Sequence, residues 1–289
     1  MIENIIYVND NHSTVLHEEQ DTVYITFPKL DAYKDDMIHG FSTRKGGVSQ
    51  GYLGTMNLSF TRGDDRENVL ENHRRFAQTL GYDEKKLVFS NQVHHTAFHK
   101  VTKEDCGKGI VRESDILEID GLVTNEPGVP MITFYADCVP LFFYDPQHKV
   151  IAMAHSGWRG TVNNMAQAAV DKLGSEFGSR PEDIIAFIGP SICASCYEVG
   201  EDVAENFFNA YGAEADKVLK IKKETEAGKK YYLNLHAANR INMLHAGIPE
   251  ENISVTDICT CCNPELLFSH RASKGKRGGL CAYMMIAEV

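Results

Sequence analysis

The sequence lacks any long hydrophobic run. No apolar stretch in its 289 residues approaches the roughly 18 residues that a membrane-spanning helix requires. The first residues, MIENIIYVNDNHS, contain neither a basic segment nor an apolar core, so we expect no signal peptide. Internal repeats, low-complexity segments and linker-like stretches are absent as well. These absences favour a cytoplasmic protein without a membrane partner, folded as a single α/β domain over residues 1–289.

An excess of positive charge is also lacking. The chain has 29 lysines and arginines against 40 aspartates and glutamates, a formal net charge of −11. This balance argues against nonspecific binding to nucleic acid, although a few local arginines can still bind a small anion. The apolar fraction of 43% is enough for a sizeable core, and the charged fraction of 24% is typical of a globular chain. We expect a monomer or a weak homo-oligomer.

The eight cysteines do not suggest a disulfide framework, because a long chain without a secretory signal normally keeps its thiols reduced. Cys193 and Cys196 form a C-x-x-C pair. Together with Cys261 and Cys262, or with Cys259 and Cys262, this pair could form a structural four-thiolate zinc site. Simple burial of the thiols is the alternative. A redox role is less favoured, since the pair follows a Gly-Pro turn and does not open a helix.

Hydrophobic periodicity predicts alternating helices and strands. Asp64 or Asp65 can cap a helix over 66–80 that Gly81 ends, and Thr161 can cap a helix reaching Phe177. Further helices are expected over 200–211 and 235–246. The apolar runs 119–124, 130–135, 140–144 and 150–154 are typical of strands in one buried sheet. Other strands are expected over 5–8, 22–27, from 87, and over 184–188, 231–233, 253–256 and 280–286.

Three side chains with metal-binding chemistry follow such apolar runs. They are His94, Cys138 and His155. Zinc favours cysteine sulfur and histidine nitrogen, and catalytic zinc sites use three protein ligands and leave one position open. The spacing fits no zinc finger or ribbon, and each residue alone could be an ordinary core side chain. Taken together, they indicate an open metal site.

A set of short motifs shows a family resemblance. The motifs are NQVH (91–94), DGLVT (120–124), ADC (136–138), HSGWRG (155–160), GPSI (189–192) and CYEVG (196–200). With them the chain resembles the YfiH family, also called the laccase-domain or multicopper polyphenol oxidase family, from residue 39 to residue 271. Two departures are His95, where family members usually have glycine, and Arg271-Ala272, where they have an arginine pair.

The resemblance implies a four-layer α/β/β/α fold with mixed sheets and one zinc ion per chain, bound by His94, Cys138 and His155. It also implies the phosphorolysis of adenosine, inosine, guanosine and methylthioadenosine to the free base and ribose 1-phosphate. Adenosine deamination is implied as a second activity. Purine nucleosides and phosphate are therefore the expected partners, and Gln92 is expected to contact the substrate.

The two reactions require different help from the protein. Deamination needs a group that shuttles a proton, for which Asp120 and Asp137 are candidates. Phosphorolysis needs an anion site, and the planar guanidinium group suits it; Arg44, Arg159 and Arg271 are candidates, all in glycine-rich or strand-end loops. Cys138 and His155 are expected to combine ligand and catalytic roles.

Three alternative functions use the same residues. A copper-dependent phenol oxidase is disfavoured, because the twelve histidines are scattered and only His94 and His95 are adjacent. A metal-free cysteine hydrolase would use Cys138 as the nucleophile and His155 as the base. A binding module would keep the pocket without the metal.

Overall fold

Two β-sheets form the centre of the molecule, one antiparallel and one mixed. A computed structural model describes residues 4–225 and 228–288. The five-stranded sheet is antiparallel and has the order β1 (Val15–Glu19), β2 (Thr22–Thr26), β3 (Met37–Ser42), β14 (Leu280–Ile286) and β6 (Met131–Tyr135). The six-stranded sheet has the order β13 (Ile253–Val255), β9 (Ile185–Ile188), β7 (Val139–Asp145), β8 (Val150–Ser156), β5 (Gly121–Thr124) and β4 (Phe98–Lys100).

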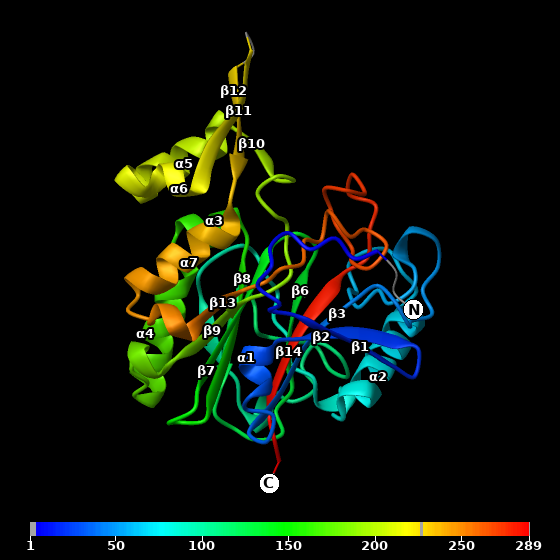
Figure 1. The fold of residues 1–289 in the computed structure, drawn as a ribbon. Helices are drawn as coiled ribbons and strands as arrows, with labels where there is room; N and C mark the ends of the chain where they lie inside the picture. Colours follow the sequence, from blue (N-terminus) through cyan, green and yellow to red (C-terminus); the bar gives the residue numbers. More distant parts are fainter. Residues whose placement is uncertain (1–3, 226–227, 289) are drawn as a thin grey trace.

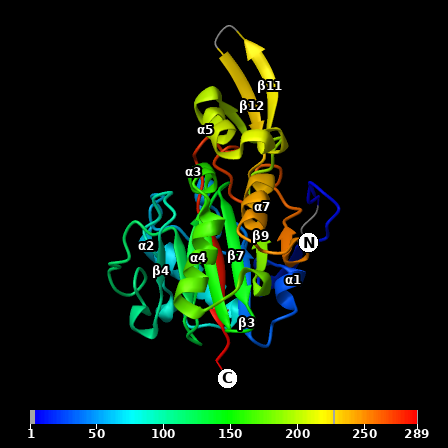
Figure 2. The same cartoon turned by 90° about the vertical axis from the view of Figure 1, so that its left-hand side faces the viewer.

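Helices cover the outer faces of both sheets (Figures 1 and 2). On the outer face of the six-stranded sheet lie α3, α4 and α7, and on that of the five-stranded sheet lies α2. The helices are α1 (Pro28–Asp31), α2 (Arg66–Leu80), α3 (Trp158–Val162), α4 (Met165–Phe177), α5 (Glu201–Tyr211), α6 (Ala215–Val218) and α7 (Leu235–His245).

Strand alternation sorts the apolar side chains into three cores. In β7, Leu141 and Phe143 face the helices, whereas Phe142 and Tyr144 face the other sheet. In β14, Tyr283 packs towards α2 while its neighbours point inward. Successive side chains of a strand point to opposite faces, so three cores require four layers. The predicted α/β/β/α arrangement is therefore confirmed.

The prediction that four consecutive runs share one sheet was wrong. Residues 131–135 form β6, the edge strand of the five-stranded sheet, while β5, β7 and β8 belong to the other sheet. The hairpin at 146–149 does join β7 to β8 as expected. Strand β6 pairs with β14, which lies about half the chain away, and hydrophobic periodicity carries no information about so distant a partner.

Three local predictions also need correction. Residues 5–8 form no strand, and Tyr7 makes only an isolated bridge to Ile258. The run beginning at residue 87 contributes only the bridge from Val88 to Met131. Thr161 lies inside the short helix α3; the following helix α4 is capped instead by Asn164, whose side chain accepts a hydrogen bond from the backbone of Gln167.

A small third sheet projects from one end of the molecule, next to α5 and α6 (Figure 1). It consists of β10 (Glu198–Gly200), β12 (Gly228–Leu233) and β11 (Leu219–Thr225), in that order and antiparallel. No helix in the described part of the chain is long and apolar enough to cross a membrane.

Candidate metal centre and its cavity

His94, Cys138 and His155 converge between the two large sheets. Their ligand atoms all lie within 4.8 Å of one another. His155 is the penultimate residue of β8, and Cys138 lies in the three-residue connection from β6 to β7, which crosses from one sheet to the other. His94 comes from the loop between α2 and β4. The predicted ligands are thus brought together from three separate segments.

The backbone adopts left-handed conformations beside these side chains. His94 has φ +66°, and Asp137, the residue before Cys138, has φ +91°. Left-handed backbone in residues with a Cβ costs free energy and is found preferentially at functional sites. At Asp137 the conformation is held by its own side chain, because Oδ1 accepts a hydrogen bond from the Thr260 hydroxyl (2.6 Å) and Oδ2 accepts one from the Arg271 backbone N–H (2.7 Å).

Asp120 is a fully buried carboxylate that organises the histidine ligands. Its oxygens accept hydrogen bonds from the backbone N–H groups of Val93 (3.0 Å), His94 (3.0 Å) and His95 (2.9 Å). Oδ1 also lies 2.8 Å from Nδ1 of His155. This contact occupies Nδ1 and leaves Nε2 as the nitrogen of His155 that can bind a metal. Asp120 therefore positions both histidines through these four hydrogen bonds, and its role as a proton shuttle stays a prediction.

The electrostatics of the site favour a thiolate. Burial alone would raise the pKa of Cys138, but the charge of His155 and hydrogen bonds from His155 and His94 outweigh it and lower the pKa to about 6. Burial would likewise lower the pKa of His155, but Cys138 and Asp120 raise it to about 9. An ionised thiolate beside two imidazole rings is a soft donor set that fits zinc, so the residues present suit the metal implied by the resemblance.

Gly157 closes one side of the ligand set. A Cβ at this position would lie 2.9 Å from Cδ2 of His94 and 3.1 Å from Sγ of Cys138. Contacts below about 3 Å are not tolerated without displacement, so the absence of a side chain here is what lets the His94 ring and the Cys138 sulfur approach each other.

A cavity of about 310 Å³ opens onto the three ligands. Its other lining includes a group of aromatic rings: Phe60, Phe89 and Phe134. Volumes of this order, an apolar wall and a few convergent polar groups are typical of small-molecule sites.

Two arginines that the sequence analysis did not assign to the site line the same cavity. They are Arg62 and Arg277. Burial and the neighbouring charge of Arg62 lower the pKa of Arg277 to about 10. Nε of Arg277 is buried and has no hydrogen-bond partner among the described residues. Both directly precede a glycine, and that local pattern is the sequence signal that could have indicated them.

The predicted anion-binding arginines lie elsewhere. Arg44 donates hydrogen bonds to the carbonyls of Gly54 (2.9 Å) and Pro264 (2.7 Å). Arg271 donates to those of Cys196 (3.1 Å) and Glu198 (2.9 Å). Neither is among the residues that line the cavity, and their guanidinium groups already hold loops together.

Arg159, Gln92 and His95 have distinct positions. Arg159 is exposed, stacks over the Trp158 ring at 4.4 Å and does not line the cavity. Gln92 does line it, but its amide is paired with the backbone N–H and C=O of Phe134 at the edge of β6. The His95 side chain is exposed and lies outside the group of potential ligands.

The layered fold and the group of two histidines and one cysteine together define a class of α/β protein with a ligand set between its sheets that could hold a metal ion. The chain belongs to the family described as multi-copper polyphenol oxidoreductase laccase, whose model matches residues 38–287. This confirms the family suggested by the motifs.

Relatives and solved structures agree with this assignment. The purine nucleoside phosphorylase YlmD of Bacillus subtilis is 36% identical over 88% of this chain and 90% of its own length. The mouse purine nucleoside phosphorylase LACC1 is 31% identical over 86% of this chain, which spans 55% of the mouse protein. The crystal structure of YlmD from Geobacillus stearothermophilus superposes with a TM-score of 0.85 at 33% identity and covers 95% of this chain and 100% of that one.

Proposed function

We propose that this protein is a zinc-dependent purine nucleoside phosphorylase acting on adenosine, inosine, guanosine and methylthioadenosine, with adenosine deamination as a second activity. The observation that carries the proposal is the cavity, which combines three soft metal ligands, an aromatic wall and two arginines, in a chain whose relatives are named purine nucleoside phosphorylases. Both large sheets contribute to this cavity, so we propose that residues 1–289 act as one catalytic domain.

The two arginines are the proposed phosphate-binding groups. Neither Arg62 nor Arg277 forms an ion pair among the described residues, and the charge of Arg62 lowers the pKa of Arg277. Two guanidinium groups without an ion-pair partner that line one cavity attract a dianion, and phosphate accepts hydrogen bonds in the geometry that guanidinium offers. The proposed anion site therefore uses other arginines than Arg44, Arg159 and Arg271, the candidates named from the sequence.

The aromatic wall is the proposed site of the purine. Phe60 and Phe89 are stacked with ring centroids 5.9 Å apart, and Phe134 meets the Phe89 ring edge-on at 5.1 Å. All three are partly exposed, which leaves ring surface available to a planar base. Apolar and aromatic lining provides affinity for a purine, while the few polar groups set its orientation.

The residues of the proposed metal site would hold the zinc ion and fix its ligands in the cavity. A zinc ion held by His94, Cys138 and His155 would supply Lewis-acid chemistry there. Asp120 keeps a proton on Nδ1 of His155 and fixes the ring, and through the loop N–H groups it also fixes His94. The sulfur of Cys138 is held ionised without further proton transfer.

The test is an incubation of the purified protein with adenosine, with and without phosphate, in which adenine, ribose 1-phosphate and inosine are measured. We expect adenine and ribose 1-phosphate only when phosphate is present, and inosine in either case. Cys138→Ala should lose the metal ion of the cavity and both activities while the circular dichroism spectrum stays unchanged. Absence of turnover in protein with confirmed zinc would contradict the nucleoside proposal.

A metal-free cysteine hydrolase is the second candidate, and one observation favours it. Cys138, His155 and Asp120 are connected in the order nucleophile, base and orienting carboxylate, and the pKa values of the first two favour a thiolate and an imidazolium. Metal analysis and alkylation separate the two functions. Protein without zinc whose Cys138 reacts rapidly with iodoacetamide at pH 7 would support the hydrolase.

Copper phenol oxidation is disfavoured by the ligands available. The described residues contain two groups that could hold a metal, and only two histidines occur in them. A multicopper cluster needs many more imidazole ligands. Oxygen uptake in the presence of a phenol and copper is the corresponding assay, and we expect none.

A further inference from the structure

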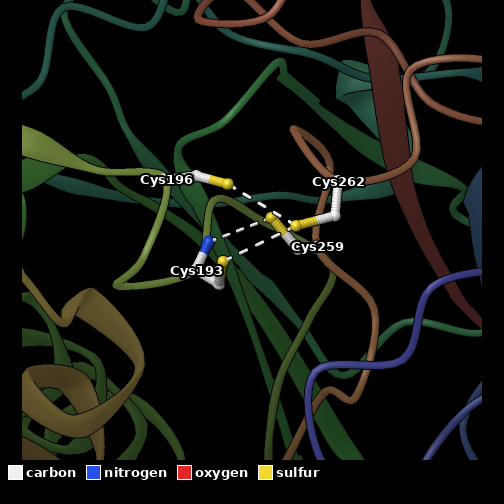
Figure 3. Close-up of side chains that lie close together, drawn as sticks. All are labelled: Cys193, Cys196, Cys259 and Cys262. Atoms are coloured by element: carbon white, nitrogen blue, oxygen red, sulfur yellow. Dashed lines mark hydrogen bonds between the residues drawn. The ribbon is translucent and has the colours of Figure 1, made fainter.

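Four cysteines outside the cavity form a second compact cluster (Figure 3). The sulfurs of Cys193, Cys196, Cys259 and Cys262 all lie within 4.8 Å of one another. Sγ of Cys262 lies 3.5 Å from that of Cys196 and 3.9 Å from that of Cys193. All four thiols are free. Cys261, the remaining cysteine of this loop, is not part of the cluster.

The fold brings the two pairs together through adjacent parallel strands. Strands β9 and β13 are neighbours at the edge of the six-stranded sheet, and each is followed by a loop that carries one C-x-x-C pair. The loops remain joined beyond the strands, because Ser191 and Cys259 form a parallel bridge and the Thr260 N–H donates to the Ser191 carbonyl (3.2 Å). The juxtaposition is thus fixed by sheet pairing.

A backbone amide is directed at one of the four sulfurs. The Cys193 N–H donates a hydrogen bond to Sγ of Cys259 (3.2 Å). Amide groups directed at sulfur stabilise negative charge on it, as they do for thiolates that bind a metal.

The sulfur–sulfur distances match one bound metal ion better than they match a disulfide or an iron–sulfur cluster. Four thiolates at the zinc–sulfur distance of about 2.3 Å in tetrahedral geometry lie about 3.8 Å apart. A disulfide would need about 2.0 Å. An iron–sulfur cluster interposes several atoms between its cysteines and would hold them farther apart than they are here.

We propose that Cys193, Cys196, Cys259 and Cys262 bind one structural zinc ion, distinct from the ion proposed in the cavity. With all four positions filled by protein, the ion would have no open coordination position for substrate. This proposal does not depend on the enzymatic activity proposed above.

The cluster is connected to the cavity through Asp137. Thr260 lies between two of the four cysteines, and its hydroxyl donates to Oδ1 of Asp137. The Ile192 N–H, adjacent to Cys193, donates to the Asp137 carbonyl (3.0 Å). Asp137 directly precedes Cys138, so an ion that fixes the two loops would also hold the backbone that presents Cys138.

The test is the zinc content of protein purified under reducing conditions without added metal. We expect about two zinc ions per chain in the wild type, and about one in both Cys138→Ala and Cys262→Ser. If only the cavity site fails, the wild type holds one ion, Cys138→Ala still holds one, and Cys262→Ser holds none. If only the four-cysteine site fails, Cys262→Ser holds the same amount as the wild type.

Cys261→Ser is the matched control, because it removes a thiol from the same loop but outside the cluster. It should keep both ions and the wild-type melting temperature, whereas Cys262→Ser should lower the melting temperature. If Cys262→Ser does not fold, Cys262→His provides the variant, since a three-cysteine, one-histidine site also binds zinc. It should fold and retain the ion.

A direct observation on Cys138→Ala completes the test. Cobalt substituted into this variant should show the charge-transfer absorption of a tetrathiolate site, and X-ray absorption at the zinc edge should give only sulfur neighbours at about 2.3 Å. A disulfide between the pairs in the purified protein, iron in place of zinc, or four freely titrating thiols in metal-free folded protein would each overturn the proposal.

Discussion

Replacing Asp120 by asparagine tests whether this carboxylate positions the histidine ligands or only stabilises the fold. The carboxylate accepts four hydrogen bonds, three from backbone N–H groups of the His94 loop and one from His155. An asparagine offers one acceptor oxygen and places an NH₂ group where the other oxygen was. At least two donors then lose their acceptor in a fully buried position.

The expected magnitude follows from those lost bonds. A buried donor without a partner costs about 1–3 kcal/mol, so Asp120→Asn should lower the free energy of unfolding by about 2–6 kcal/mol. The orientation of His94 and His155 is lost with it. Removing a carboxylate that orients a metal-bound histidine typically weakens metal binding about 10- to 100-fold.

Asp145→Asn is the matched control. Asp145 is also fully buried, accepts backbone hydrogen bonds from Gln147 and His148, and contacts Nδ1 of His148 at 2.7 Å. It begins the hairpin at the end of β8 remote from His155. This variant should lose stability by a similar mechanism and keep its metal affinity.

The free energy of unfolding is measured by urea unfolding of the metal-free proteins. The zinc affinity is measured by competition against a chromophoric chelator. We expect only Asp120→Asn to show a weaker zinc affinity, measured at a urea concentration where both variants are folded. Unchanged affinity in Asp120→Asn would refute the positioning role. Equal losses in both variants would show that metal binding simply follows global stability.

Three further predictions concern the cavity and the core. Gly157→Ala should weaken zinc binding about 10- to 100-fold in the same chelator assay, because its methyl group would crowd Cys138, whereas wild-type affinity would show that the site can relax. Arg277→Gln should raise the KM for phosphate about 10- to 100-fold, because it removes a charged hydrogen-bond donor from the cavity. The control Arg74→Gln, at an exposed position, should leave this KM unchanged. Equal KM values in the two variants would mean that phosphate binds elsewhere. Burial lowers the pKa of His73 to about 4, so the folded protein does not take up the proton that the unfolded chain binds below about pH 6.5. Between pH 7 and pH 5 this group should therefore lower the free energy of unfolding by about 2 kcal/mol. Urea unfolding should show a smaller decrease in His73→Gln.

Local features of the fold were predictable because their causes are local. The helix over 66–80 was predicted with its bounds, since Asp65 caps it and Gly81 ends it in a left-handed conformation. The last strand, 280–286, was also predicted with its bounds. The edge strand β1 was missed because its residues are largely exposed and charged, so it has no apolar face for a sequence pattern to reveal.

That the three candidate ligands lie together could be predicted, because few residue types share the metal-binding chemistry of cysteine and histidine. Cysteine and histidine at strand ends are unusual, and the three predicted ligands do converge. The arginines were harder, because a guanidinium group serves loop carbonyls as well as anions, and only the fold shows which partner is near. All three of Arg44, Arg271 and Arg277 donate to carbonyls, but only Arg277, in the loop before β14, also lines the cavity.

The short connection from β6 to β7 ties the two sheets to the cavity. Residues 136–138 are all that separate a strand of one sheet from a strand of the other, and Cys138 is the last of them. Separation of the sheets would therefore displace the sulfur from the two histidines. An ion bound to all three would oppose that opening by a free energy that grows with the logarithm of the ion concentration. Hydrogen exchange of the amides in β6 and β14 should consequently slow when zinc is added, so the rate at which the sandwich opens becomes a measure of metal occupancy.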